Sequence, residues 1–440
     1  MSADAAGLAR LRADLGRGEV PGYIYADEAV FAREREAVFA RTWNCLGHES
    51  EIPNHGDYVV RYIGDDSLIV TRTSDGTVQA FHNVCRHRGM EICRAEAGST
   101  TTHVCPYHAW TYDGDGRLTG VPMEKPGYGP DGLDKSRYGL RAVAHVGVYR
   151  GLIFATLDPG ACPLAAWLGD FAWYLDLVLG RTPLGLEVTG PPQRWITGGN
   201  WKMAAENFVG DSYHAAFTHR SVMEIGLHPN TMRDWTRGGK RNGVHVQVPP
   251  GSVGFTRLAP ADRGYPVDLV ALFAQTLPPV QRDLLGGAEP KWPSRMHLYP
   301  NLSFLGGACY VAPGVQIPFL TMRLWRPLAA GKIEVWSWVL VEREASPDFK
   351  RLSQRAYTLT FGSSGTEEQD DAENWSSIAR GARGTASGAM QQALHMGVAE
   401  TVPPIVADWP GPGTAYDTTY GDIGQRWLLG RWLDDMERAS

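Results

Sequence analysis

The chain has 440 residues, of which 43% are hydrophobic and 20% charged, so the sequence indicates a soluble globular protein with two or three domains. A formal net charge of −6 argues against a nucleic-acid-binding protein, which usually carries a basic face. The N-terminal residues lack the apolar core of a secretory signal, and aspartates and prolines interrupt the most apolar long segment, residues 152–179, so a cytoplasmic location is predicted.

Residues 58–119 alternate short apolar segments with turns. YVVRYIG, SLIVTRT and VQAFHNV are typical of β-strands, and YDGDGRLTG is typical of a hairpin. This pattern predicts a small β-rich domain near the N-terminus.

Two cysteine–histidine pairs lie within this β-rich region. Cys85 is followed by His87, and Cys105 is followed by His108, with 17 residues between the pairs. Two loops that each supply one thiolate and one imidazole suit a [2Fe–2S] cluster with two cysteines on one iron and two histidines on the other. Zinc is the alternative, but zinc fingers use a cysteine pair followed by a histidine pair.

The motif CRHRG…CPYHAW with this spacing resembles the Rieske domain of aromatic-ring-hydroxylating dioxygenase large subunits. The resemblance implies a Rieske [2Fe–2S] cluster held by Cys85, His87, Cys105 and His108.

The sequence changes character after residue 163. Residues 163–180 and 197–222 are expected to contain helices, residues 294–306 and 333–344 strands, and residues 370–382 and 424–439 helices. Because helices and strands do not alternate strictly, the pattern favours an α+β fold with antiparallel sheet.

A second set of potential metal ligands lies in the segment AENFVGDSYHAAFTH. His214 and His219 are five residues apart, and Asp211 precedes His214 by three. Positions five apart on an ideal helix differ by about 140°, so two ligands of one metal require a helix end or a distortion between them. Two histidines and one carboxylate form the facial triad of non-haem Fe(II) oxygenases. Spacing alone does not choose among the later carboxylates, which are Glu367, Glu368, Asp370 and Asp371.

The segments ENFVGDSYH…TH and EQDDAENW resemble the catalytic domain of the same dioxygenase family. The resemblance implies that His214, His219 and Asp371 bind one mononuclear Fe(II). It also implies that Asn207 lies close to the iron without binding it, and that Asp211 is a catalytic bridging carboxylate.

The same resemblance implies the architecture. A β-rich Rieske domain at residues 40–155 is inserted into a catalytic domain with a curved antiparallel sheet flanked by helices, formed by residues 1–39 and 156–440. Family members assemble as α3 or α3β3, and the cluster of one subunit supplies electrons to the mononuclear iron of its neighbour. Asp211 of one chain would then connect to His108 of the next.

The implied reaction is O2-dependent cis-dihydroxylation of an aromatic ring. The sequence contains no dinucleotide-binding fingerprint, so electrons from NAD(P)H are expected to arrive through a separate ferredoxin and reductase. The alternatives are a Rieske monooxygenase that hydroxylates or dealkylates an aromatic acid, and an electron-transfer Rieske protein without oxygenase activity.

The residues expected to line the substrate pocket by the resemblance are Phe208, Ser212, Ala215, Phe361 and Glu367, together with Asn207. Glu367 departs from the family pattern, in which an aromatic residue is usual, and it is expected to face solvent or to pair with a base. No cationic residue stands in these motifs to hold a substrate carboxylate. The motifs therefore favour a neutral bicyclic or tricyclic aromatic substrate.

Overall fold

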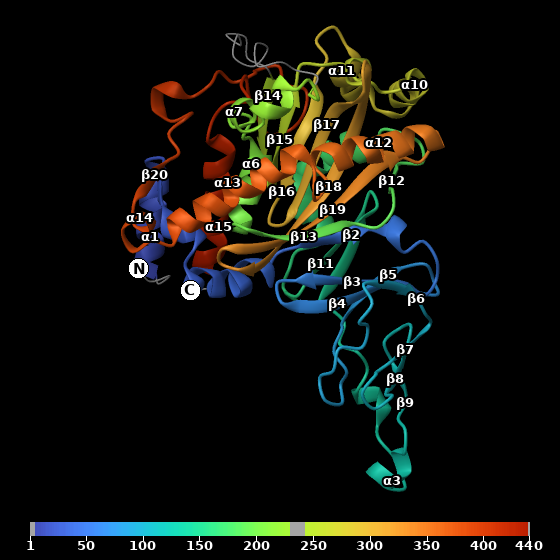
Figure 1. The fold of residues 1–440 in the computed structure, drawn as a ribbon. Helices are drawn as coiled ribbons and strands as arrows, with labels where there is room; N and C mark the ends of the chain where they lie inside the picture. Colours follow the sequence, from blue (N-terminus) through green and yellow to red (C-terminus); the bar gives the residue numbers. More distant parts are fainter. Residues whose placement is uncertain (1–4, 229–242, 439–440) are drawn as a thin grey trace. The chain divides into compact units, whose positions relative to one another are not determined.

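The computed structural model describes residues 5–228 and 243–438, and it divides into two compact units (Figure 1). One unit comprises residues 39–164, and the other joins residues 1–38 to residues 165–440. Every paired strand in both units is antiparallel, and helices accompany the sheets, so the predicted α+β class is confirmed. The boundaries expected at residues 39/40 and 155/156 stay a prediction.

The unit of residues 39–164 consists of three small sheets with the orders β10-β11-β2, β5-β4-β3-β6 and β7-β8-β9. Its strands are β2 (Asn44–His48), β3 (Asp57–Ile63), β4 (Asp66–Arg72), β5 (Val78–His82), β6 (Ala97–Ser99), β7 (Thr102–Val104), β8 (Thr111–Asp113), β9 (Leu118–Gly120), β10 (His145–Tyr149) and β11 (Leu152–Thr156). The one α-helix among its described residues is α3 (Glu124–Tyr128). The predicted β-rich domain with its hairpins is therefore present.

The other unit is built on a nine-stranded sheet with the order β12-β19-β18-β17-β16-β15-β14-β21, in which β13 also pairs with β19. These strands are β12 (Leu186–Val188), β13 (Gln193–Gly198), β14 (Gly243–Val248), β15 (Gly251–Thr256), β16 (Trp292–Leu298), β17 (Leu302–Ala312), β18 (Val315–Ala329), β19 (Lys332–Glu342) and β21 (Thr414–Tyr416). A separate short pair joins β1 (Glu19–Pro21) to β20 (Gln391–Ala393). The long central strands are buried almost throughout, because helices and loops cover the sheet.

Thirteen α-helices accompany this sheet in the described part of the unit, and Figure 1 shows the orange helices α12 and α13 lying across the front of it. They are α1 (Ala5–Gly16), α2 (Glu28–Glu34), α4 (Leu164–Leu168), α5 (Ala172–Leu179), α6 (Trp201–Val209), α7 (Ala215–Thr218), α8 (Arg220–Glu224), α10 (Val267–Thr276), α11 (Pro279–Gly286), α12 (Pro347–Thr360), α13 (Thr366–Ala382), α14 (Thr385–Gly388) and α15 (Ile423–Arg438). The helices and strands predicted after residue 163 are confirmed at α4–α7, β16, β17, β19, α13 and α15. No described helix is both long enough and apolar enough to cross a lipid bilayer.

A buried ion pair fixes α6 in this unit. The Asn200 side chain caps the helix by accepting a hydrogen bond from the backbone N–H of Lys202. The fully buried Lys202 pairs with Glu34, which also accepts a 2.9 Å hydrogen bond from the indole of Trp201. Because both charges are buried, each depends on the other, and the pair holds the first turn of α6 in place.

Candidate metal centres and active site

Two loops of the same design present the first set of predicted metal ligands. The backbone N–H of Cys85 donates to the carbonyl of Met90 at 2.9 Å, and that of Cys105 donates to the carbonyl of Trp110 at 2.8 Å. In each loop the residue four positions after the cysteine, Gly89 or Ala109, returns a hydrogen bond to the cysteine carbonyl and has a positive φ of 75° or 56°. The repeated CxH and CxxH patterns therefore fold into two matching turns.

The four side chains of these loops converge. The Nδ1 atoms of His87 and His108 lie 3.1 Å apart, while both cysteines are buried within the domain core. Tyr112 places its hydroxyl 3.3 Å from the Sγ of Cys85, and Trp110 stacks on the ring of His87 at 5.0 Å between centroids. Two sulfurs on the inner side and two imidazoles on the outer side fit the ligation of a Rieske cluster. A hydroxyl beside a ligand sulfur is a group that tunes the reduction potential.

Replacing His108 by Ala is expected to remove or disorder the [2Fe–2S] cluster while leaving the other unit folded. The variant removes one of four ligands, so the visible absorption of the cluster should disappear and about two irons per chain should be lost. The matched control is His145→Ala, which removes an exposed histidine of the same unit. A normal Rieske spectrum in the His108 variant would overturn the ligand assignment.

The second predicted metal site lies in the larger unit. Oδ1 of Asp371 lies 3.5 Å from Nε2 of His214 and 3.5 Å from Nε2 of His219. One ligand atom from each of the three residues falls within 4.8 Å of the others. The Asp371 oxygen is buried and has no hydrogen-bond partner in the described structure. Two imidazoles and an otherwise unsatisfied carboxylate oxygen fit a mononuclear Fe(II).

A break in the helix brings the two histidines together. His214 is the N-cap of the four-residue helix α7, and His219 is its C-cap, with φ −94° and ψ 24°. The next helix, α8, begins directly afterwards at Arg220. As the five-residue spacing requires, His219 therefore lies at a helix end rather than on a continuous helix.

The choice between neighbouring aspartates is visible in the geometry. Asp371 is buried on the inner side of α13, whereas Asp370 is partly exposed and contacts only Nδ1 of His219, at 3.3 Å. The buried Arg323 holds this end of α13 by donating to Glu368 at 2.6 Å and to the carbonyl of Phe361 at 2.7 Å. Asp371 is thus presented to both histidines by a fixed helix.

Burial and neighbouring charges shift the pKa values of the three residues. Burial lowers the pKa of His214, but the Asp211 carboxylate outweighs burial and raises that pKa to about 9. Burial lowers the pKa of His219 to about 3. Burial also raises the pKa of Asp371 to about 6. A divalent cation among these groups would stabilise the Asp371 carboxylate and compete with protons for the imidazole lone pairs.

Asp211 lies behind one of the histidines. Its Oδ2 is 3.0 Å from Nδ1 of His214, and its other oxygen accepts a 3.1 Å hydrogen bond from the backbone N–H of the same residue. Burial raises the pKa of Asp211, but the attraction of His214 outweighs it, so the pKa is below its ordinary value. A carboxylate on Nδ1 fixes the imidazole so that Nε2 faces the metal position.

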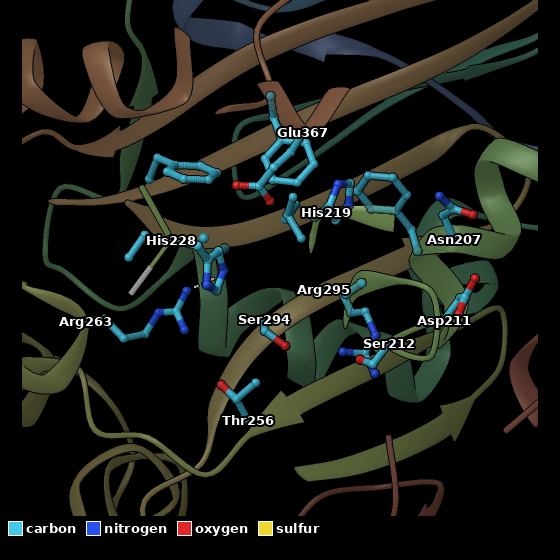
Figure 2. Close-up of a pocket in the computed structure, with 18 of the residues that line it drawn as sticks. Asn207, Asp211, Ser212, His219, His228, Thr256, Arg263, Ser294, Arg295 and Glu367 are labelled. Carbon is cyan, nitrogen blue, oxygen red and sulfur yellow. Dashed lines mark hydrogen bonds between the residues drawn. The ribbon is translucent and has the colours of Figure 1, made fainter. Parts of the chain in front are cut away.

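A cavity of about 290 Å³ opens beside the three residues. It is lined by all the predicted pocket residues, which are Asn207, Phe208, Ser212, Ala215, Phe361 and Glu367. Figure 2 shows Asn207 and Asp211 at one end of this cavity, with His219 and Glu367 along its upper wall. Glycines make part of the remaining wall, since a Cβ on Gly307 would lie 2.1 Å from the ring of Phe319. The fold thus leaves an open cavity next to the proposed metal ligands.

The expectation for Glu367 was wrong. Its side chain is neither in solvent nor paired with a base, because it is 5% exposed and no hydrogen bond or ion pair joins it to another described residue. Burial, with the nearby charges of Asp371 and Asp370, raises the pKa of Glu367 to about 8. Its position in the first turn of α13, where backbone N–H groups are unpaired, favours a carboxyl group there.

Two arginines of the cavity were missed by sequence reasoning. Arg263 and Arg295 are buried in its wall, and burial lowers the pKa of each to about 10, so both remain charged at neutral pH. Neither stands near the histidine or aspartate motifs in the sequence. No local sequence pattern marks either arginine, since all residues of β16 around Arg295 are buried.

The chain matches two family models. Residues 42–144 match the Rieske [2Fe-2S] domain, and residues 164–402 match the catalytic domain of the ring hydroxylating alpha subunit. The first model covers both cysteine–histidine loops, and the second covers His214, His219 and Asp371.

Individual relatives match along nearly the whole chain. The biphenyl dioxygenase subunit alpha of Paraburkholderia xenovorans (strain LB400) is 34% identical and the match covers 97% of this chain and 93% of the relative. The N,N-dimethyl phenylurea N-demethylase subunit alpha of Sphingobium sp. (strain YBL2) is also 34% identical, with the same coverage. The crystal structure of naphthalene 1,2-dioxygenase from Rhodococcus sp. bound to indole matches with a TM-score of 0.91 and 39% identity over 100% of both chains.

These matches extend over both metal-binding motifs. Enzymes of this family are terminal oxygenases with a Rieske cluster and a mononuclear iron, and they work with other subunits and electron-transfer partners. The chain belongs to the family of Rieske non-haem iron ring-hydroxylating oxygenases, as an alpha subunit that carries both the Rieske domain and the catalytic domain.

Proposed function

We propose that this alpha subunit cis-dihydroxylates a neutral bicyclic or tricyclic aromatic compound, using O2 and electrons from a ferredoxin and reductase. The observation that carries the proposal is the cluster of His214, His219 and Asp371 at the wall of a cavity of about 290 Å³. A mononuclear iron held by these residues supplies the O2 chemistry, and a cavity beside it holds the ring.

The side chains of the chain perform separate tasks in this proposal. Phe208, Phe319 and Phe361 provide apolar surface against a flat ring system. Ala215 is small and leaves room beside the histidines, while Asn207 and Ser212 are uncharged polar groups at the same end of the cavity. Asp211 holds the imidazole of His214 with Nε2 toward the metal position.

The proposed partners follow from the electron path. Cys85, His87, Cys105 and His108 hold the cluster that receives electrons from the ferredoxin. Because Nδ1 of His108 faces the other histidine, Nε2 is left for a contact with another group, which we propose is Asp211 of a neighbouring subunit. Trimers of this chain, with small subunits as α3β3, would provide that contact. We also propose that the enzyme is cytoplasmic, since it depends on electrons that the reductase takes from NAD(P)H.

The size and polarity of the substrate are supported by the apolar walls and by the named relatives. The relatives include biphenyl and naphthalene dioxygenases, whose named substrates are neutral and bicyclic. Asp371 would repel a carboxylate near the iron ligands, and Glu367, whose pKa burial raises to about 8, would not attract one. Of the two buried arginines, Arg263 lies on the side of the cavity opposite Asp211. Arg295 lies near Asp211, and the Asp211 carboxylate already attracts its guanidinium.

A side-by-side turnover assay tests the substrate class. With the complete electron-transfer chain, naphthalene, biphenyl and fluorene are expected to give cis-diols at least about tenfold faster than benzoate, phthalate and salicylate. A ring carboxylate would place a negative charge beside Asp371 and against the apolar cavity wall. Products are identified by mass spectrometry with 18O2, which should add two labelled oxygen atoms to one ring. Markedly faster turnover of the carboxylates would contradict the proposal of a neutral substrate.

N-dealkylation is a second candidate function, because one 34% identical relative is named as a phenylurea N-demethylase. It predicts release of formaldehyde from N,N-dimethyl phenylureas, with one oxygen atom from O2 in the product. Formaldehyde without any diol from the neutral ring compounds would favour this function over dihydroxylation.

A further inference from the structure

Arg263 is a buried cation in the cavity wall without a carboxylate partner. It is 8% exposed, and no ion pair joins it to any residue in the described part of the chain. Its Nη2 donates a 2.6 Å hydrogen bond to the carbonyl of Gly306, while its Nε is buried without a partner. An uncompensated buried charge is costly, so it requires an explanation beyond packing.

The neighbouring groups do not neutralise Arg263. The carboxylate of Asp262, next in the chain, is exposed and accepts a hydrogen bond from the backbone N–H of Ala259. The other cavity arginine, Arg295, differs in this respect, because its guanidinium is attracted by Asp211. For Arg263 the one titratable neighbour that raises its pKa is the phenol of Tyr265, and no carboxylate in the described part of the chain forms an ion pair with it.

The loop that carries Arg263 is held firmly. The residue ends the 3-10 turn Ala261–Arg263 and precedes Gly264, which has φ 90°. A Cβ on Gly264 would lie 2.4 Å from the carbonyl of Gln316, so the loop packs closely against the start of β18. The amide of Gln316 also donates to the carbonyl of Asp262 at 3.0 Å. The guanidinium is therefore presented in one place rather than carried on a free loop.

Arg263 stands away from the metal ligands. Figure 2 shows its guanidinium directed into the cavity, on the side opposite Asn207 and Asp211. Ser294 and Thr256 lie on the same lower wall. The hydroxyl of Ser294 already donates to the carbonyl of Gly254 at 3.1 Å, so Arg263 is the cationic donor of this region. Arg263 and the proposed metal ligands line the same cavity.

We propose that this end of the cavity is a binding subsite for an acceptor oxygen on the substrate, with the guanidinium of Arg263 as its donor. The inference rests on the proposed function, because it requires an aromatic substrate in this cavity. The acceptor oxygen lies on the part of the ring system remote from the ring that is attacked. A ketone carbonyl and a carboxylate offer this same chemistry, and a guanidinium can donate to either.

Binding of three matched tricyclic compounds tests the subsite. Fluorene, 9-fluorenone and fluorene-9-carboxylate share one ring skeleton and differ in the group at one position. Their dissociation constants are measured on the holoenzyme by calorimetry, without turnover. Fluorenone is expected to bind about tenfold tighter than fluorene, since a hydrogen bond to a charged group is worth about this factor or more.

Variants assign this preference to Arg263. Arg263→Met should reduce the ratio of the fluorene and fluorenone dissociation constants to about one, and Arg263→Lys should retain part of it. Arg257→Gln is the matched control, because this neighbouring arginine lies outside the cavity wall and pairs with Asp417. Melting temperatures are recorded for each variant, since Arg263→Met also removes the donor to Gly306.

The outcomes separate this inference from the proposed function. A preference shown only by the carboxylate, and lost in Arg263→Met, supports the subsite but contradicts a neutral substrate. Equal binding of all three compounds by the wild type overturns the subsite, whatever their turnover shows. A lowered melting temperature with an unchanged fluorenone preference in Arg263→Met also overturns it, because Arg263 then only holds the loop to β17.

Discussion

Replacing Asp371 by Asn is expected to remove the mononuclear iron and to abolish product formation. The variant keeps the shape of the side chain but removes the negative charge that Oδ1 places 3.5 Å from each of the two Nε2 atoms. Two neutral imidazoles alone are a weak site for Fe(II), which prefers a carboxylate as its third protein ligand. Iron analysis should fall from about three to about two irons per chain, with an unchanged Rieske absorption spectrum.

Asp370→Asn is the matched control for this experiment. Asp370 precedes Asp371 directly, but it is partly exposed and contacts only Nδ1 of His219. We expect this variant to keep its mononuclear iron, with activity lowered at most about tenfold through the orientation of the imidazole. Loss of the iron in Asp370→Asn, with retention in Asp371→Asn, would exchange the roles of the two aspartates.

Replacing Asp211 by Asn should lower multiple-turnover product formation by about 100-fold, the upper end of the effect of removing a group that orients a metal ligand. The amide keeps the size of the side chain but loses the charge next to Nδ1 of His214, at 3.0 Å. In the proposed trimer it also loses the acceptor for His108 of a neighbouring subunit. Both effects should slow the delivery of electrons to the iron. Neither should weaken the binding of the iron or of the cluster.

The metal centres provide the internal control for Asp211→Asn. Iron content and the Rieske spectrum should match the wild type, and oxidation of the reduced cluster after addition of substrate and O2 should be slow. Product formation at the wild-type rate would show that Asp211 is not required for electron transfer. Loss of iron would assign it a role in holding His214 only.

The two cavity arginines occupy different surroundings. Arg295 lies near Asp211, which attracts it, whereas Arg263 lies on the side opposite Asp211. Phe208 and Phe361 line the cavity and offer apolar surface to the middle of a bound ring system. We therefore expect substrate selection in this chain to depend on residues beyond the proposed iron ligands.

The sequence by itself determined the parts of this protein that depend on local spacing. The CxH and CxxH pairs carry all four proposed cluster ligands within two short turns, and each turn is closed by its own backbone hydrogen bonds. Hydrophobic period and turn residues likewise predicted the β-rich unit and the main helices, because such elements arise from interactions between residues close in the chain.

Only the tertiary structure decided what depends on residues far apart in the chain. Asp371 meets His214 and His219 because α13 is anchored through Arg323, 48 residues earlier on β18, and no local pattern separates it from Asp370. Glu367 was expected to face solvent or to pair with a base, yet the packing of α13 buries it in the cavity. Arg263 reaches the same cavity from a loop without any motif, since a side chain's surroundings are set by the segments packed around it rather than by its neighbours in sequence.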